Sequence, residues 1–255
     1  AVASVLKKET VCVSVGWANS EIGTVMPIAD IARRIRAHES VHKTEIMFHS
    51  DAGQAPLYLS TTAHSLGIDV LTLDSSKLYG PRGVGALYIS PRTQLAPILH
   101  GGGQERGLRP GTENVALVCG FAAALAHISS IRESEARRIR TIRDLLYSDI
   151  VGAVPQVVLN GDLHHSLPHM LNISVPGIQS EYTTLALDHA GFAVSTKSAC
   201  REGKESESHV VAALGGEAWR AQRTLRISLG ESSRAQDTKN FASALTAIVN
   251  TAAGR

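Results

Sequence analysis

Cysteine is scarce in this sequence: Cys12, Cys119 and Cys200 are the only three among 255 residues. No two of them share the Cys-x-x-Cys spacing typical of zinc sites and redox motifs, and three is an odd number. The count and the spacing argue against a disulfide framework and against a structural metal site, so we expect no bound metal. Each cysteine has to be considered as a single thiol.

A surplus of one charge is also missing. Lysine and arginine total 25 against 23 for aspartate and glutamate, which gives a net charge of +2. Proteins that bind nucleic acid or anionic membranes usually carry a clear basic excess, so we expect neither partner. The charge balance still permits a small anionic ligand.

Long apolar runs are the third absence. By inspection, no run approaches the roughly 18 residues that span a bilayer, and residues 1–10 lack the apolar centre of a signal peptide. We therefore expect a soluble protein of the cytoplasm. With 44% hydrophobic residues, a chain of this length can bury a sizeable core in one large or two modest domains.

The first half of the chain alternates short apolar runs with amphipathic stretches, a pattern typical of parallel strands joined by helices. A helix is predicted after Pro27, with an apolar face at i, i+3, i+4 and i+7 spacing. A second, long helix, broken at most once, is predicted over residues 114–150. The predicted strands are 10–15, 45–49, 70–73 and 85–89.

After Gly152 the pattern changes to short strands with intervening helices, which predicts a smaller α+β domain. Ser233 and Gln236 have the spacing of a capping box at the start of the last helix. We expect two domains, a large α/β domain over residues 1–131 and a small domain over 132–255. The predicted elements of the small domain are strands 157–159, 171–175, 193–195 and 225–228 and a helix at 181–189.

Two polar residues follow strands in the first half. Lys77 lies in a turn after strand 70–73, where its amine could form a Schiff base and the hydroxyl groups of Ser75 and Ser76 could bind phosphate oxygens. Asp51 follows strand 45–49, where its carboxylate could pair with a protonated pyridine nitrogen. Together these two residues meet the two fixed requirements of a pyridoxal phosphate site. An exposed lysine and an aspartate in a turn are the alternatives.

Other candidates are weaker when taken singly. Asn19 could hydrogen-bond a phenolic oxygen or a carboxylate, and Arg226, between apolar strand neighbours, could bind a substrate carboxylate or simply face outward. Cys200 lies in a polar loop and is the reactive candidate. Cys12 lies in an apolar strand and Cys119 in an alanine-rich helix, so we expect both to be buried and inert.

Six motifs, in the same order over nearly the whole chain, resemble those of the cysteine desulfurases of iron-sulfur cluster assembly, within the class V aminotransferase group. One motif alone would be weak, but six in order are specific. They read Asn-Ser-Glu-Ile-Gly, His-Ser-Asp-Ala-Gly-Gln, Ser-Lys-Leu-Tyr-Gly-Pro-Arg-Gly-Val-Gly, His-Gly-Gly-Gly-Gln-Glu-Arg-Gly-Leu-Arg-Pro-Gly-Thr-Glu-Asn, Ser-Ala-Cys and Leu-Arg-Ile-Ser-Leu-Gly.

The resemblance implies an aspartate-aminotransferase-like fold with a mostly parallel sheet, and an enzyme that converts L-cysteine to L-alanine and a persulfide on the enzyme. It also implies a homodimer and a sulfur-acceptor or iron-sulfur scaffold protein as partner. The implied roles are Lys77 for the Schiff base, Asp51 for the pyridinium, Asn19 and Gln54 beside the ring oxygen, Ser76 for the phosphate, Thr112 for the phosphate of the neighbouring subunit, Arg226 for the substrate carboxylate and Cys200 for the nucleophile.

The chain also departs from the family. Asp74, Ser75, Ser76 and Lys77 stand where many relatives have Ser-Gly-His-Lys, so a carboxylate lies near the expected phosphate. The opening third of a typical family member, with the histidine that stacks on the ring, is not found before Asn19, so we expect a truncated or split desulfurase. Two alternatives stay open: a catalytically silent dimerising or scaffold fragment, and a selenocysteine lyase.

Overall fold

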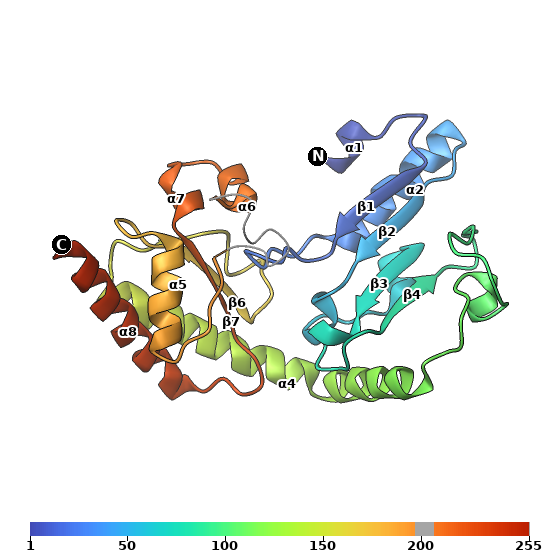
Figure 1. The fold of residues 1–255 in the computed structure, drawn as a ribbon. Helices are drawn as coiled ribbons and strands as arrows, with labels where there is room; N and C mark the ends of the chain where they lie inside the picture. Colours follow the sequence, from blue (N-terminus) through green and yellow to red (C-terminus); the bar gives the residue numbers. More distant parts are fainter. Residues whose placement is uncertain (197–206, 255) are drawn as a thin grey trace. The chain divides into compact units, whose positions relative to one another are not determined.

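The chain divides into two compact units in a computed structural model that describes residues 1–196 and 207–254 (Figure 1). The first unit is Ala1–Trp17 with Met26–Arg132, and the second is Ala18–Val25 with Glu133–Arg255. Each unit has its own sheet. The assignment of the two halves to a cofactor domain and a small domain stays a prediction.

The sheet of the first unit has four strands in the order β1-β2-β3-β4. The first three strands run parallel, and β4 is antiparallel to β3. The structure therefore confirms the expected α/β architecture with a mostly parallel sheet. The strands are β1 (Cys12–Gly16), β2 (Met47–Asp51), β3 (Val70–Asp74) and β4 (Gly85–Ile89).

Helix α2 (Ile28–His42) is the crossover between β1 and β2. Its four buried residues are the predicted apolar face, Ile28, Ile31, Ala32 and Ile35. Arg36 on this helix donates to the backbone oxygen of Ile46 at 3.0 Å and to the carboxylate of Asp69 at 2.6 Å. The remaining short elements of the unit are α1 (Val2–Val5), η1 (Ala55–Leu57), α3 (Ala63–Leu66), η2 (Ser75–Lys77) and η3 (Glu105–Gly107).

Helix α4 (Val115–Ala153) is continuous, and residues on both sides of the unit boundary belong to it. It corrects one expectation, because α4 is long and apolar enough, by length and composition, to cross a membrane. Apolar residues far outnumber the polar ones at the start of this helix, so the average there is apolar although no unbroken apolar run of that length exists. Core helices of soluble proteins pass the same test, and length and composition alone assign no span.

The predicted burial of two cysteines is wrong. Cys12 and Cys119 are both exposed. Cys12 lies on the exposed side of the edge strand β1, and Cys119 lies beside Val118, which is 49% exposed, on α4. Apolar sequence neighbours indicate the type of element, but they do not tell which of its faces is covered.

The second unit contains a three-stranded antiparallel sheet in the order β5-β6-β7, which agrees with the predicted α+β pattern. Its strands are β5 (Val158–Leu159), β6 (Met170–Ser174) and β7 (Thr224–Ser228). Its helices, besides the end of α4, are α5 (Ser180–His189), α6 (His209–Ala213), α7 (Trp219–Gln222) and α8 (Ala235–Ala253).

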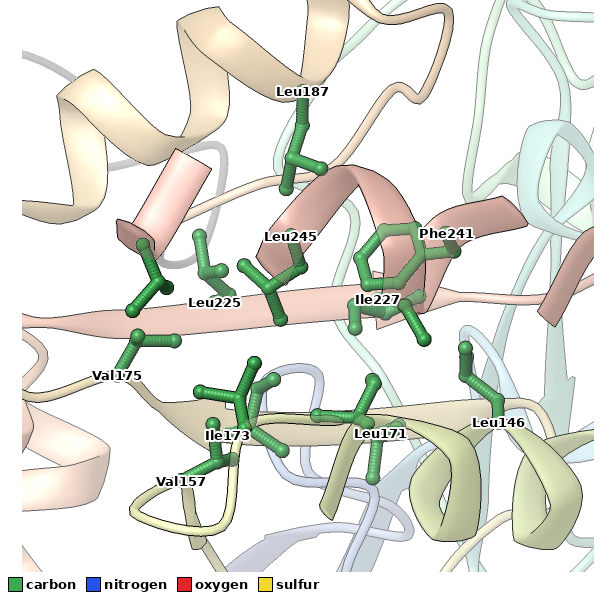
Figure 2. Close-up of a cluster of buried hydrophobic side chains, with 14 of the residues drawn as sticks. Leu146, Val157, Leu171, Ile173, Val175, Leu187, Leu225, Ile227, Phe241 and Leu245 are labelled. Atoms are coloured by element: carbon green, nitrogen blue, oxygen red, sulfur yellow. The ribbon is translucent and has the colours of Figure 1, made fainter. Parts of the chain in front are cut away.

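Hydrophobic side chains from strands β6 and β7 and from helices α4, α5 and α8 form the core of this unit, as Figure 2 shows. Leu171 of β6 and Ile227 of β7 are register partners, and Leu187, Leu245 and Phe241 from α5 and α8 pack with them. This core holds the sheet edge on which Arg226 lies.

Two local predictions differ from the structure. Residues 193–195 form no strand, and only a single bridge joins Ser195 to Arg226. The capping box of α8 lies one residue later than predicted, since Asp237 accepts the backbone N–H of Arg234 at 3.0 Å. Ser233 instead accepts the N–H of Gly230 at 3.0 Å, because the turn before the helix uses its hydroxyl group.

Candidate functional site

The carboxyl ends of β1, β2 and β3 meet at one edge of the first unit's sheet. Gly16 pairs in register with Asp51, and Asp51 pairs with Thr72. Parallel strands therefore bring Asp51, at the end of β2, beside the end of β3. Ligands of open α/β sheets bind outside this edge.

Asp51 and Lys77 converge on Gly53. The backbone N–H of Gly53 donates to Asp51 Oδ1 at 2.9 Å, which fixes the carboxylate. A Cβ atom at Gly53 would lie 3.4 Å from Asp51 Oδ1 and 3.6 Å from Lys77 Nζ. The amine and the carboxylate therefore lie around the same small space, which a side chain at Gly53 would fill.

The turn that carries Lys77 is closely packed. Ser75 is fully buried, and the N–H groups of Leu78 and Gly80 both donate to its backbone oxygen at 3.0 Å. A Cβ at Gly80 would lie only 2.3 Å from Ser75 Oγ, so this position requires glycine. Tyr79 between them has a φ of 58°, a costly backbone conformation for a bulky residue. The position of Lys77 is thus set by a rigid turn.

Ser76 is exposed in the same turn, and its donors are already used. Its backbone N–H donates to Asp74 Oδ1 at 2.9 Å, and its hydroxyl group donates to the same oxygen at 2.8 Å. Asp74 is the N-cap of η2. The residue predicted for the phosphate therefore has a carboxylate as its present partner.

A polar row beside Asp51 was missed by the sequence analysis. His49 Nδ1 lies 2.8 Å from Ser14 Oγ, and His49 Nε2 lies 2.8 Å from Thr72 Oγ1. The row crosses β1, β2 and β3 and ends at Thr72, the register partner of Asp51. Alternation along β2 places His49 and Asp51 on one face, which is the signal that could have indicated it.

The two other candidates of the first unit are Gln54 and Thr112. Gln54 is half-buried, three residues after Asp51, at the start of η1. Thr112 is exposed in the segment between η3 and α4. Their assigned roles stay predictions.

In the second unit, Asn19 organises a turn. Its side-chain oxygen accepts the N–H groups of Glu21 at 2.8 Å and Ile22 at 3.0 Å. Gly23 in this turn has a φ of 74°, and a Cβ there would lie 3.1 Å from the Cβ of Met170. Because the Asn19 oxygen serves the turn, a ligand would meet the amide nitrogen.

Arg226 joins this turn to Ser195. Its Nη1 donates to the backbone oxygen of Ser20 at 3.1 Å. Its backbone N–H donates to Ser195 at 2.6 Å, and the Ser195 N–H donates back at 3.1 Å. Arg226 is half-buried, and its hydrogen bond to Ser20 places it beside the Asn19 turn. Cys200, the predicted nucleophile, lies outside the described residues.

His169 is the buried titratable group near Arg226. Burial, and then the positive charges of Arg143 and Arg226, lower the pKa of His169 from 6.5 to about 4. The imidazole is therefore neutral at pH 7. Arg143 is itself 2% exposed and donates to Ser166 Oγ at 3.2 Å.

The first unit's residues fit a pyridoxal ring. Such a ring needs an amine for its aldehyde carbon and a carboxylate or guanidinium for its nitrogen. Lys77 Nζ and Asp51 Oδ1 supply these groups around the space left by the missing side chain of Gly53. The turn and the Gly53 hydrogen bond hold both groups in place.

Comparison with known proteins agrees with this chemistry. The chain is 37% identical over 245 residues to a putative cysteine desulfurase IscS 1 of Bacillus subtilis, covering 96% of this chain and 63% of that protein. It is 38% identical over 227 residues to the cysteine desulfurase NifS of Azotobacter vinelandii, covering 89% of this chain and 55% of that protein.

A solved NifS-like protein superposes with a TM-score of 0.88 at 29% identity over 98% of this chain and 64% of its own length. The chain thus spans about three-fifths of the length of such relatives. The family model named Aminotransferase class-V matches residues 1–241. This chain belongs to the class-V aminotransferase family.

Proposed function

We propose that this chain is the part of a pyridoxal phosphate-dependent cysteine desulfurase that holds the cofactor lysine and the sulfur-accepting cysteine. The observation that carries the proposal is the convergence of Asp51 and Lys77 on Gly53, in a chain whose relatives are named cysteine desulfurases. When bound, the cofactor supplies an electron sink for the bonds at an amino acid's α-carbon. Gln54 would contact the ring oxygen and Ser76 the phosphate.

Two further residues complete the proposed cofactor site. The Asn19 amide nitrogen would donate to the ring oxygen or to the substrate, since its oxygen holds the turn. Thr112 would bind the phosphate held by a second copy of the chain, so the proposal includes a homodimer. The exposure of Thr112 supports this role.

Arg226 would bind the carboxylate of L-cysteine. Its planar guanidinium can donate two parallel hydrogen bonds to a carboxylate, which an ammonium group cannot do. The contact with Ser20 holds the guanidinium beside the Asn19 turn, and the bridge to Ser195 holds the Arg226 backbone. This placement supports a substrate site in which the amino acid lies near the start of the cysteine loop.

Cys200 would accept the sulfur. The carbon–sulfur bond of L-cysteine breaks and a sulfur–sulfur bond forms, which leaves a persulfide on Cys200 and L-alanine. The hydrogen count balances because, in net terms, one proton moves from the Cys200 thiol to the β-carbon of alanine. The outer sulfur of this persulfide would then be transferred to an acceptor or iron-sulfur scaffold protein of the cytoplasm, which breaks the sulfur–sulfur bond and leaves the Cys200 thiol.

Borohydride reduction in the presence of pyridoxal phosphate, followed by peptide mass spectrometry, tests the proposal. We expect the reduced cofactor on Lys77 and L-cysteine-dependent formation of L-alanine. Lys77→Ala should abolish both, whereas Lys239→Ala, a change of an exposed lysine on α8, should alter neither. A cofactor mapped to another lysine, or a chain that takes up none, would overturn it. Faster turnover of selenocysteine than of L-cysteine would favour the alternative of a selenocysteine lyase.

A further inference from the structure

Asp74 occupies a special position in the turn that carries Lys77. It is half-buried at the end of β3, and one of its carboxylate oxygens accepts two hydrogen bonds from a single residue. These come from the backbone N–H of Ser76 at 2.9 Å and from its hydroxyl group at 2.8 Å. An N–H and a hydroxyl directed at one anionic oxygen is the arrangement that a phosphate oxygen would also use.

The two anions cannot share these donors fully. A hydroxyl group has one proton and a backbone amide has one, so a bond to a phosphate oxygen weakens or replaces the bond to Asp74. A phosphate at Ser76 would also lie close to the Asp74 carboxylate, and like charges at short range repel. Both effects lower the contribution of a phosphate group to binding.

The rest of the turn offers little compensation. Ser75, the other hydroxyl, is fully buried against Gly80 and is unable to reach a ligand on the exposed side. Among Asp74–Gly80 the single cation is Lys77, whose amine is the group assigned to the aldehyde.

We propose that Asp74 acts as a resident anion in the phosphate turn and weakens the binding of the cofactor's phosphate by competing for the Ser76 donors. The inference rests on the proposed function and deepens it. Cofactor affinity in this chain then comes mainly from the ring and from the bond to Lys77, with a small share from the phosphate at Ser76.

The test compares pyridoxal phosphate with pyridoxal, which lacks the phosphate, through the dissociation constant of each measured by absorbance. Asp74→Ser should bind pyridoxal phosphate about tenfold more tightly or better, because hydrogen bonds to charged groups have this strength, while its affinity for pyridoxal stays unchanged. Serine also caps helices well, so the turn is kept. Asp74→Asn keeps the acceptor without the charge and should fall between the two. Asp30→Asn, on the exposed side of α2, is the matched control.

Ser76→Ala provides an independent measurement. This substitution should weaken the binding of pyridoxal phosphate more in the Asp74→Ser protein than in the natural chain. The Ser76 hydroxyl group is released from residue 74 only in the Asp74→Ser protein. Equal costs in both backgrounds, or an Asp74→Ser protein that gains nothing for pyridoxal phosphate or gains equally for pyridoxal, would overturn the inference. Failure of every variant to form a reducible adduct on Lys77 would instead overturn the proposed function, and this inference with it.

Discussion

The Ser208 hydroxyl group donates a hydrogen bond to the Glu21 carboxylate at 2.5 Å, although 187 residues separate the two along the chain. Both residues are 1% exposed. Ser208 also accepts the N–H of Val211 at 3.1 Å and so caps α6. This pair fixes the start of α6 to the Ala18–Val25 stretch of the same unit.

Ser208→Ala should therefore destabilise the protein. It removes a donor from a buried carboxylate and the cap of α6, and each loss costs on the order of 1–2 kcal/mol. Urea unfolding followed by circular dichroism measures the change in the free energy of unfolding. Ser208→Thr keeps the hydroxyl group and serves as control. An alanine variant with the unfolding midpoint of the natural protein would contradict the expectation.

Asp51→Asn should keep the cofactor and lose turnover. Asparagine can still accept the Gly53 N–H, but it lacks the negative charge that keeps a pyridine nitrogen protonated. We expect L-alanine formation to fall on the order of a hundredfold, as when other preorganised electrostatic groups are removed. Borohydride trapping on Lys77 should remain. Activity close to that of the natural protein would remove Asp51 from the mechanism.

Arg226→Lys should raise the KM for L-cysteine by about tenfold, because a bidentate bond to the carboxylate becomes a single one. The dissociation constant of pyridoxal phosphate should stay within twofold. Arg223→Lys, half-buried just before β7, is the matched control. If both constants change equally in Arg226→Lys, its role is structural.

Cys200→Ser should retain binding of L-cysteine and lose persulfide and almost all L-alanine formation. The exposed positions of Cys12 and Cys119 make Cys12→Ser and Cys119→Ser neutral for stability, within about 0.5 kcal/mol. Mass spectrometry after alkylation locates the sulfane sulfur. Its presence on Cys12 or Cys119 in place of Cys200 would disprove the assignment.

His169 should make stability depend on pH. Its folded pKa of about 4 lies below the ordinary 6.5, so the unfolded chain binds a proton at a higher pH than the folded one. Its contribution is complete above pH 6.5 and is lost as the pH falls toward 4, at most about 3 kcal/mol. In His169→Gln, the midpoint of urea unfolding should change less between pH 7 and pH 4.5 than it does in the natural protein. An unchanged slope would show that other groups are responsible.

Local pattern predicted much of the first unit. The apolar periodicity of α2 and the polar residues at the ends of β2 and β3 depend on short-range sequence, and parallel strands share an edge, so Asp51 and Lys77 could be expected together. Other features depend on distant residues. His49 meets Ser14 and Thr72, 35 and 23 residues away, and no local pattern specifies such partners.

The exposure of Cys12 was not predicted for a similar reason. Strand alternation gives two faces, but tertiary contacts decide which is covered. The hydrogen bonds from Ser76 to Asp74 were also not predicted, because several acceptors compete for a turn serine and the choice depends on backbone geometry.

The membership of Ala18–Val25 in the second unit has an evolutionary consequence. Glu21 accepts hydrogen bonds from Ser208 and Asn172, and the N–H of Leu167 donates to the backbone oxygen of Gly23 at 2.9 Å. The second unit is therefore discontinuous in the gene. A recombination event within α4 would separate these partners, and a hybrid of two diverged relatives would inherit mismatched halves. We expect the two stretches to descend together, because exchange of this unit alone between relatives requires three crossovers along the chain and not one.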